Sequence, residues 1–124
     1  MGNDKNITEA SLGKNGFICA YIMDTAFQKY GKKRSGRMYI TYEQYGQVYD
    51  EARGASFFDF SRIVLISSIN SLVNLFFIEK KIVENNLRIL VKGPSYQTIR
   101  EDLISRADEY AKYLNKIGWV ENDR

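Results

Sequence analysis

The spacing of apolar residues predicts a first α-helix over residues 15–30. One face of this helix would carry five apolar side chains at helical spacing: Phe17, Ile18, Tyr21, Ile22 and Phe27. Gly31 follows, at a position where a left-handed residue often ends a helix. Residues 1–13 are polar by comparison, and we expect them to form a flexible arm. After the helix, Met38-Tyr39-Ile40 has the aromatic and β-branched content of a short strand.

Two more helices are predicted between residues 42 and 77. Thr41 and Gln44 have the spacing of a capping box, which starts a helix at about Tyr42. Gly54 would end it, and its buried stripe comprises Tyr45, Val48, Tyr49 and Ala52. Ser56 with Asp59 can cap a third helix that runs to about Phe77. The buried face of this third helix comprises Leu65, Ile69, Leu72 and Phe76.

The third helix lies in an uncharged stretch, residues 63–78, which raises the question of a membrane span. The stretch is sixteen residues long and includes three Ser and two Asn. A membrane-spanning helix needs about twenty mostly apolar residues. We therefore expect no insertion into a membrane.

Residues 79–92 predict a β-hairpin, and residues 96–117 a long final helix. Asn85-Asn86 suits a tight turn between two β-prone runs. Ser95 can cap the helix, and Gly118 can end it, so that Trp119 and Val120 fold back on a neighbour. Apolar residues recur along the helix with a period of about 3.5, which favours packing on the same helix of a second chain. This predicted dimer seam comprises Ile99, Leu103, Ala107, Tyr110, Leu114 and Ile117. In the alternative interpretation, the seam covers the chain's own core.

The composition argues against catalysis. Among 124 residues there is no His and one cysteine, Cys19, so neither an ordinary zinc site nor a catalytic triad with a His base can form. Carboxylate or lysine chemistry stays open, but the chain shows no paired carboxylates and no glycine-rich phosphate loop. We expect no catalytic residue, no metal and no cofactor. The single thiol and the polar first residues favour a cytoplasmic protein.

The positive charge is concentrated in two clusters. The net charge is only +3, yet residues 29–37 carry five positive and no negative charges, and residues 79–92 carry four positive against two negative. Such clusters can bind polyanions, because each Lys or Arg that meets a phosphate releases a counterion. The alternative is a pair of solvated surface segments rich in Lys and Arg.

In the order helix, strand, helix, helix and hairpin, the chain resembles winged helix-turn-helix proteins. The stretch Tyr45-Gly46-Gln47-Val48-Tyr49-Asp50-Glu51 is similar to the second helix of winged-helix domains in archaeal replication initiators. The apolar spacing from Phe60-Ser61-Arg62 to Ile78 is similar to their recognition helix. The long last helix is more similar to PadR-like regulators and to the adaptors of crenarchaeal plasmid partition systems. The resemblance covers residues 17–117.

The resemblance implies a mainly α fold with a small β-hairpin wing and a long C-terminal dimerisation helix. The parts would be an arm (1–13), a winged helix-turn-helix domain (14–93) and the dimerisation helix (94–124). The implied function is binding of double-stranded DNA as a homodimer, in transcription regulation or plasmid partition, with half-sites about 34 Å apart. A second protein of a partition or replication complex is a further candidate partner.

The resemblance also implies which residues touch DNA. Arg62 would contact a base, with Ser61, Ser67 and Asn70 as further candidates on the third helix. Phosphate contacts would come from two sets: Lys32, Lys33, Arg34 and Arg37 before the strand, and Lys80, Lys81, Arg88 and Lys92 on the hairpin.

Two departures from the resemblance, and two alternatives, bear on this function. Phe76 stands where many relatives have Gly, and the recognition face carries Ile63, Val64 and Ile66 where relatives often have polar residues. The main alternative is therefore a winged-helix module that binds protein in a replication, partition or viral assembly. A second alternative is stacking of single-stranded nucleic acid on surface tyrosines, for which the candidates are Tyr39, Tyr42, Tyr45 and Tyr49.

Overall fold

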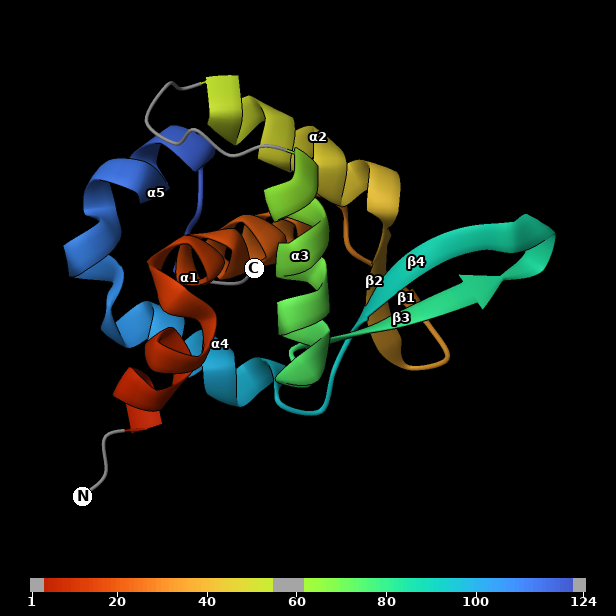
Figure 1. Cartoon of the computed structure of the whole chain (residues 1–124). Helices are drawn as coiled ribbons and strands as arrows, with labels where there is room; N and C mark the ends of the chain where they lie inside the picture. Colours follow the sequence, from red (N-terminus) through yellow and green to blue (C-terminus); the bar gives the residue numbers. More distant parts are fainter. Residues whose placement is uncertain (1–3, 55–61, 122–124) are drawn as a thin grey trace.

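Helix α1 (Asp4–Tyr30) lies at the centre of the other helices in the computed structural model (Figure 1). The structure describes residues 4–54 and 62–121, and of residues 4–10, 53, 54 and 62 the backbone only. Residues 4–12, which we expected to form an arm, have a helical backbone, and Leu12 packs against the core. A break at Gly13, with φ 75° and ψ 168°, separates this first part from the predicted helix. The four other α-helices in the described part of the chain all contact α1.

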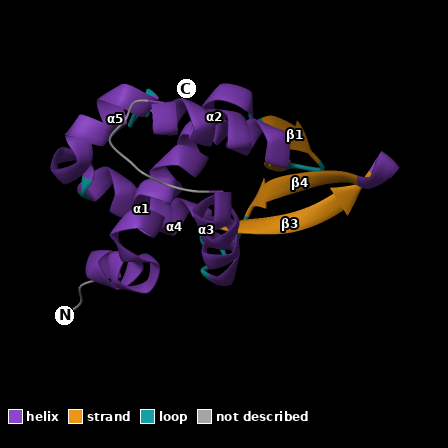
Figure 2. Cartoon of the chain, turned by 45° about the horizontal axis from the view of Figure 1, so that its top comes forward, coloured by secondary structure: helices purple, strands orange, loops and turns teal. Residues whose placement is uncertain are grey.

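Four antiparallel strands form one sheet in the order β1-β2-β4-β3, at one end of the molecule (Figure 2). Their bounds are Lys32–Arg34 (β1), Arg37–Thr41 (β2), Ile78–Val83 (β3) and Leu87–Lys92 (β4). The predicted hairpin is confirmed, with Asn85 and Asn86 at positive φ in the turn. This β3–β4 hairpin projects beyond the helices (Figure 1). The basic segment before the predicted short strand forms a strand of its own, so residues 32–41 are a second hairpin, β1–β2, with Ser35 and Gly36 in the turn.

Helix α2 (Tyr42–Gly54) begins at the predicted capping box. The Thr41 amide donates to Gln44 Oε1 at 2.9 Å, and the Gln44 amide donates to Thr41 Oγ1 at 3.0 Å. The predicted stripe of this helix is buried. Gly31, by contrast, is not left-handed: a Cβ there would collide with Met38 Cε and the Phe27 carbonyl oxygen, so close packing is what favours glycine.

Helix α3 (Arg62–Asn74) ends three residues before the predicted end at Phe77, and the proposed capping residues Ser56 and Asp59 lie outside the described residues. The expectation that Phe76 is buried is wrong: its side chain is 59% exposed, and Phe77 is buried instead. Phe76 has φ 63°, so the chain reverses there on the way into β3. Because of that reversal, the aromatic ring that reaches the core is that of Phe77, one residue later than predicted.

The predicted long final helix is interrupted. It consists of α4 (Tyr96–Ser105), the 3-10 turn η2 (Ala107–Tyr110) and α5 (Ala111–Ile117). Arg106 between the first two has φ −106° and ψ 8°, outside the helical region. Ser95 precedes α4, but among the described residues its side chain makes no capping hydrogen bond. Gly118, with φ 80°, ends α5 as predicted.

The predicted dimer seam is buried within one chain. Five of its six side chains have at most 6% exposure, Ala107 is half-buried, and all six pack on the core built around α1. The hydroxyl of Tyr21 on α1 donates to the carbonyl oxygen of Leu103 at 2.5 Å. The seam therefore covers the chain's own core, and the assignment of these residues to a dimer interface is wrong.

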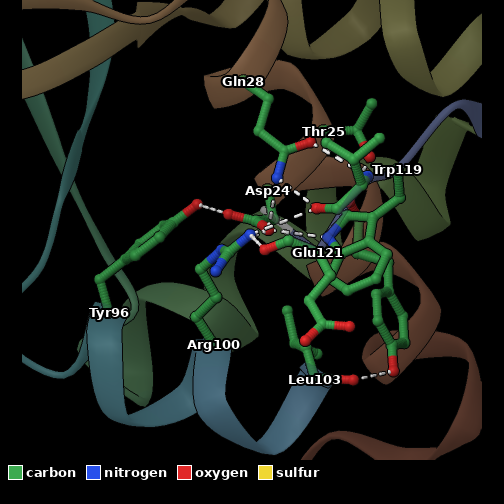
Figure 3. A network of polar contacts seen from close by, with 10 residues as sticks. Asp24, Thr25, Gln28, Tyr96, Arg100, Leu103, Trp119 and Glu121 are labelled. Atoms are coloured by element: carbon green, nitrogen blue, oxygen red, sulfur yellow. Dashed lines mark hydrogen bonds and ion pairs between the residues drawn. The ribbon is translucent and has the colours of Figure 1, made fainter. Parts of the chain in front are cut away.

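A buried carboxylate holds the C-terminal segment on α1 (Figure 3). Asp24 is 1% exposed and accepts hydrogen bonds from the Tyr96 hydroxyl, from Arg100 Nε at 2.9 Å and from Trp119 Nε1 at 2.7 Å. Arg100 also donates to the carbonyl oxygen of Glu121 at 2.7 Å. The folding back of Trp119 is thus confirmed.

None of the helices in residues 4–54 and 62–121 combines the length and apolarity that crossing a membrane requires.

Candidate nucleic-acid interface

The sheet distributes its cations over two faces. Residues paired directly across antiparallel strands project from the same side, and neighbours along a strand alternate. Ile40, paired with Leu90, belongs to the core, so their side of the sheet faces the helices. By register, the helix side also carries Lys33, Lys80, Arg88 and Lys92. The outer side carries Lys32, Arg34, Arg37 and Lys81. The two sequence clusters are therefore not two separate surfaces, because each cluster contributes to both faces.

On the helix side, a cleft of about 460 Å³ lies between the start of α2 and the β3–β4 hairpin. Its lining comprises Tyr42, Lys80, Lys81, Ile82 and Arg88. Lys80 connects the cleft to α3, because its Nζ donates to Asn70 Oδ1 at 3.2 Å. The start of α2, the hairpin and α3 thus border one surface.

This cleft is positively charged. Neither Lys80 nor Arg88 forms an ion pair with a residue that the structure describes. Burial raises the pKa of Tyr42, and the nearby positive charge of Arg88 opposes that rise. The Tyr42 hydroxyl is therefore neutral at pH 7 and able to donate a hydrogen bond. A neutral donor beside two cations suits an anionic ligand such as a phosphate.

The solvent-facing side of α3 changes character along its length. Ile63 is 77% exposed and Ile66 57%, whereas Ser67, Asn70 and Asn74 follow on the same side. The Ser67 hydroxyl donates to the carbonyl of Val64 in its own helix at 3.3 Å. Ser61 and the side chain of Arg62 lie outside the described part of the chain. The apolar half of this face therefore lies next to the start of the helix and the polar half next to the hairpin.

The remaining candidate cations are placed differently. Lys92 Nζ lies 4.4 Å from the centroid of the Tyr96 ring and 5.6 Å from that of Phe27, so it turns toward core aromatics and not into the cleft. Arg34 pairs with Glu84 at 3.2 Å, and Arg37 pairs with Glu79 at the same distance. The structure thus brings Lys80, Lys81, Arg88 and Asn70 together and leaves the other described candidates outside the cleft.

Sequence reasoning missed Tyr42 and Ile82 as cleft residues. Ile82 is two positions from Lys80, so strand alternation already placed the two on one face. Tyr42 follows the capping residue Thr41 at the point where β2 becomes α2, but its nearness to Arg88 depends on strand pairing. The tyrosines also divide: Tyr45 and Tyr49 are buried and cannot stack on bases, while Tyr39 and Tyr42 are half-buried on opposite sides of the sheet.

The described part of the chain contains no cluster of three or more His, Cys, Asp or Glu that could hold a metal ion. No protein-family model matches the chain, and neither a curated protein nor a solved structure matches it significantly.

Proposed function

We propose that this chain binds double-stranded DNA with α3 and the β3–β4 hairpin, in the manner of a winged helix-turn-helix protein. The observation that carries the proposal is the cleft in which Lys80 and Arg88, without carboxylate partners among the described residues, border the solvent-facing side of α3. Unpaired cations gain most from phosphate contacts, because no internal ion pair has to be broken.

The dimensions of the two elements suit a duplex. Helix α3 has 13 residues and is about 20 Å long, and the major groove is about 12 Å wide, enough to admit a helix. Each hairpin strand has six residues, about 20 Å, and can follow the DNA backbone. The start of α3 would enter the groove, with Arg62 and Ser61 toward base edges and the hairpin on phosphates.

The unit that binds is one copy of the chain. The seam that would have joined two copies is buried against α1, so a two-fold DNA site would need a different contact surface. We therefore expect a footprint without internal symmetry. The cellular role that fits is a transcriptional regulator or a plasmid partition adaptor.

Salt-dependent binding to labelled duplexes, followed by fluorescence anisotropy, tests the proposal. Replacing Lys80 and Arg88 together by Ala should weaken binding to all sequences and reduce the slope of log K against log salt by about two, since each phosphate contact contributes about 0.9. The matched control replaces Lys112 and Lys116, which are exposed on α5 at the other end of the molecule (Figure 1). Equal losses in both double variants, or no duplex binding at low salt, would refute the proposal.

Arg62→Ala tests base contact separately. If Arg62 bonds a guanine, its removal should cost about 1–3 kcal/mol on the preferred site and much less on random duplex. The preferred site is obtained by sequencing DNA selected by the protein from a random pool. Equal loss on both kinds of duplex would assign Arg62 to the phosphate backbone instead.

A protein-binding module is the second candidate, and the exposed Ile63 and Ile66 favour it. Two large aliphatic side chains in water at the start of α3 suit an apolar groove on another protein. Under this function the Ile66→Ser variant should lose a co-purifying partner while its free energy of unfolding stays unchanged. Retention of the partner by that variant, together with duplex binding by the parent chain, would exclude the second candidate.

A further inference from the structure

The outer side of the sheet contains a second hollow, of about 240 Å³, which faces away from the helices. Its apolar part includes Tyr39, Ile89 and Val91. Ile89 is 1% exposed and Val91 5%, although both point to the side of the sheet opposite the main core. The side chains around the hollow therefore shield Ile89 and Val91 from solvent, and the outer side of the sheet has a small apolar cluster separate from the main core.

Three cations also line this hollow, and they differ in how firmly they are held. Arg37 is anchored, because Nη1 lies 3.2 Å from Glu79 Oε1 and Nη2 donates to the Lys92 carbonyl oxygen at 2.5 Å. Lys81 has no ion pair with a described residue. Arg34 differs from both, because among the described residues its guanidinium contacts the carboxylate of Glu84 and no backbone carbonyl.

The Arg34–Glu84 ion pair joins the β1–β2 hairpin to the turn of the β3–β4 hairpin. Arg34 Nη2 lies 3.2 Å from Glu84 Oε1 and 3.4 Å from Oε2, and the two side chains are 46% and 75% exposed. An ion pair this exposed contributes little to stability. Another anion can therefore replace the Glu84 carboxylate on Arg34 at small cost.

We propose that this hollow binds a small amphipathic anion, in which one phosphate or carboxylate group is attached to an aromatic or short aliphatic group. A cavity of about 150 Å³ lined by apolar side chains can hold benzene, so the hollow has room for a ring and an anionic group. The hollow is smaller than the roughly 300–1,000 Å³ of sites for drug-sized ligands, which favours a single ring with one anionic group over a larger ligand. The ring would lie on Tyr39 and Val83, the half-buried apolar residues of the lining, and the anion would meet Arg34 and Lys81.

This inference does not depend on DNA binding. Arg34 and the apolar part of the hollow belong to the outer side, whereas Lys80 and Arg88 belong to the helix side. Lys81, on the edge strand, lines both the cleft and the hollow. The variants that test the hollow are therefore built on Arg34 and Glu84, which do not line the cleft.

The test is a titration of the isotope-labelled chain with phenyl phosphate, followed by amide chemical shifts. Phenol and inorganic phosphate serve as the two halves of the probe. Phenyl phosphate should bind about tenfold more tightly than either half and shift the amides of β1, β2 and β4 around Tyr39 and Ile89. Equal affinity for phenyl phosphate and inorganic phosphate would overturn the proposal, because it would mean attraction to surface charge alone.

Two variants with opposite expected effects identify the anion contact. Arg34→Ala should weaken phenyl phosphate binding about tenfold, whereas Glu84→Gln should strengthen it severalfold by removing the competing carboxylate. Lys80→Ala, on the helix side, and Lys112→Ala, on α5, are the controls and should leave the affinity unchanged. Weaker binding in Glu84→Gln, or equal weakening in all the lysine and arginine variants, would refute the assignment. Failure here leaves the DNA proposal intact, because duplex binding is measured separately.

Discussion

Replacement of Asp24 by Ala should be among the most destabilising single changes in this protein. The carboxylate is 1% exposed and accepts hydrogen bonds from Tyr96, Arg100 and Trp119. Arg100 is itself only 4% exposed, so the variant would leave a buried guanidinium without its counter-charge. Breaking a buried ion pair in this way costs about 3–5 kcal/mol. Against a total of about 5–15 kcal/mol for a typical domain, that is a large part of the free energy of unfolding.

Urea unfolding followed by circular dichroism measures this cost. Fluorescence of Trp119, the only Trp in the chain, serves as a second probe. Because Asp24 touches the indole directly, the fluorescence baseline will differ in the variant. The quantity to compare between the parent chain and the variant is therefore the urea concentration at the unfolding midpoint. Asp108→Ala, at an exposed position in η2, is the control and should change stability by less than about 0.5 kcal/mol.

A double-mutant cycle separates the ion pair from the packing of each partner. Arg100→Met keeps most of the side-chain volume and removes the charge. If the two groups act as a pair, the double variant should be more stable than the sum of the single costs predicts, by about 0.5–3 kcal/mol. A cost below about 1 kcal/mol for Asp24→Ala, or additive costs in the cycle, would refute the reasoning.

The remaining predictions concern the core and the backbone. Burial raises the pKa of the Cys19 thiol to about 11, so at pH 8 its reaction with a disulfide reagent should be about a hundredfold slower than that of an unperturbed thiol, and denaturant should abolish the difference. Stability should fall as the pH rises from about 9 toward 11, because the unfolded thiol ionises first; an unchanged stability there would contradict the shift. Gly46→Ala should stabilise the fold by about 0.5–1 kcal/mol, because an added Cβ in α2 would meet open space. Gly93→Ala should destabilise it, because a Cβ would collide with the Phe76 carbonyl oxygen. Thermal unfolding measures the sign of both changes in stability, and a stabilising Gly93→Ala would contradict this packing. Leu103→Asp should abolish folding, which circular dichroism detects, because it buries a charge in the core. A variant that folds as a monomer would contradict this burial and favour the original assignment of Leu103 to a dimer interface.

Local patterns predicted the parts of the fold whose causes are local. The capping box at Thr41 and Gln44 formed because each side chain meets a backbone amide three residues away. Asn85-Asn86 formed the turn because Asn tolerates positive φ. The end of α5 at Gly118 has the same kind of cause. None of these elements needs a distant partner to be specified.

The break in the final helix had no such local signal. Residues 96–117 contain neither Pro nor Gly, and their apolar period suits a continuous helix. The chain nevertheless leaves the helical region at Arg106, and the separate helices α4 and α5 each contact α1. An apolar stripe indicates that a face is buried but not what covers it. The period of about 3.5 residues favoured a second chain, whereas in the structure the chain's own core covers the stripe.

The candidate site shows the same division. The sequence by itself determined that two basic clusters exist, that the second is a hairpin, and that the helix before it is unusually apolar. Only the tertiary structure decided which cations share a surface. Strand register placed Lys80 and Arg88 with α3 and placed Arg34 and Arg37 on the outer side. The physical reason is that successive side chains along a strand project to opposite faces of the sheet. Which face meets the core is set by pairing between strands that are distant in sequence.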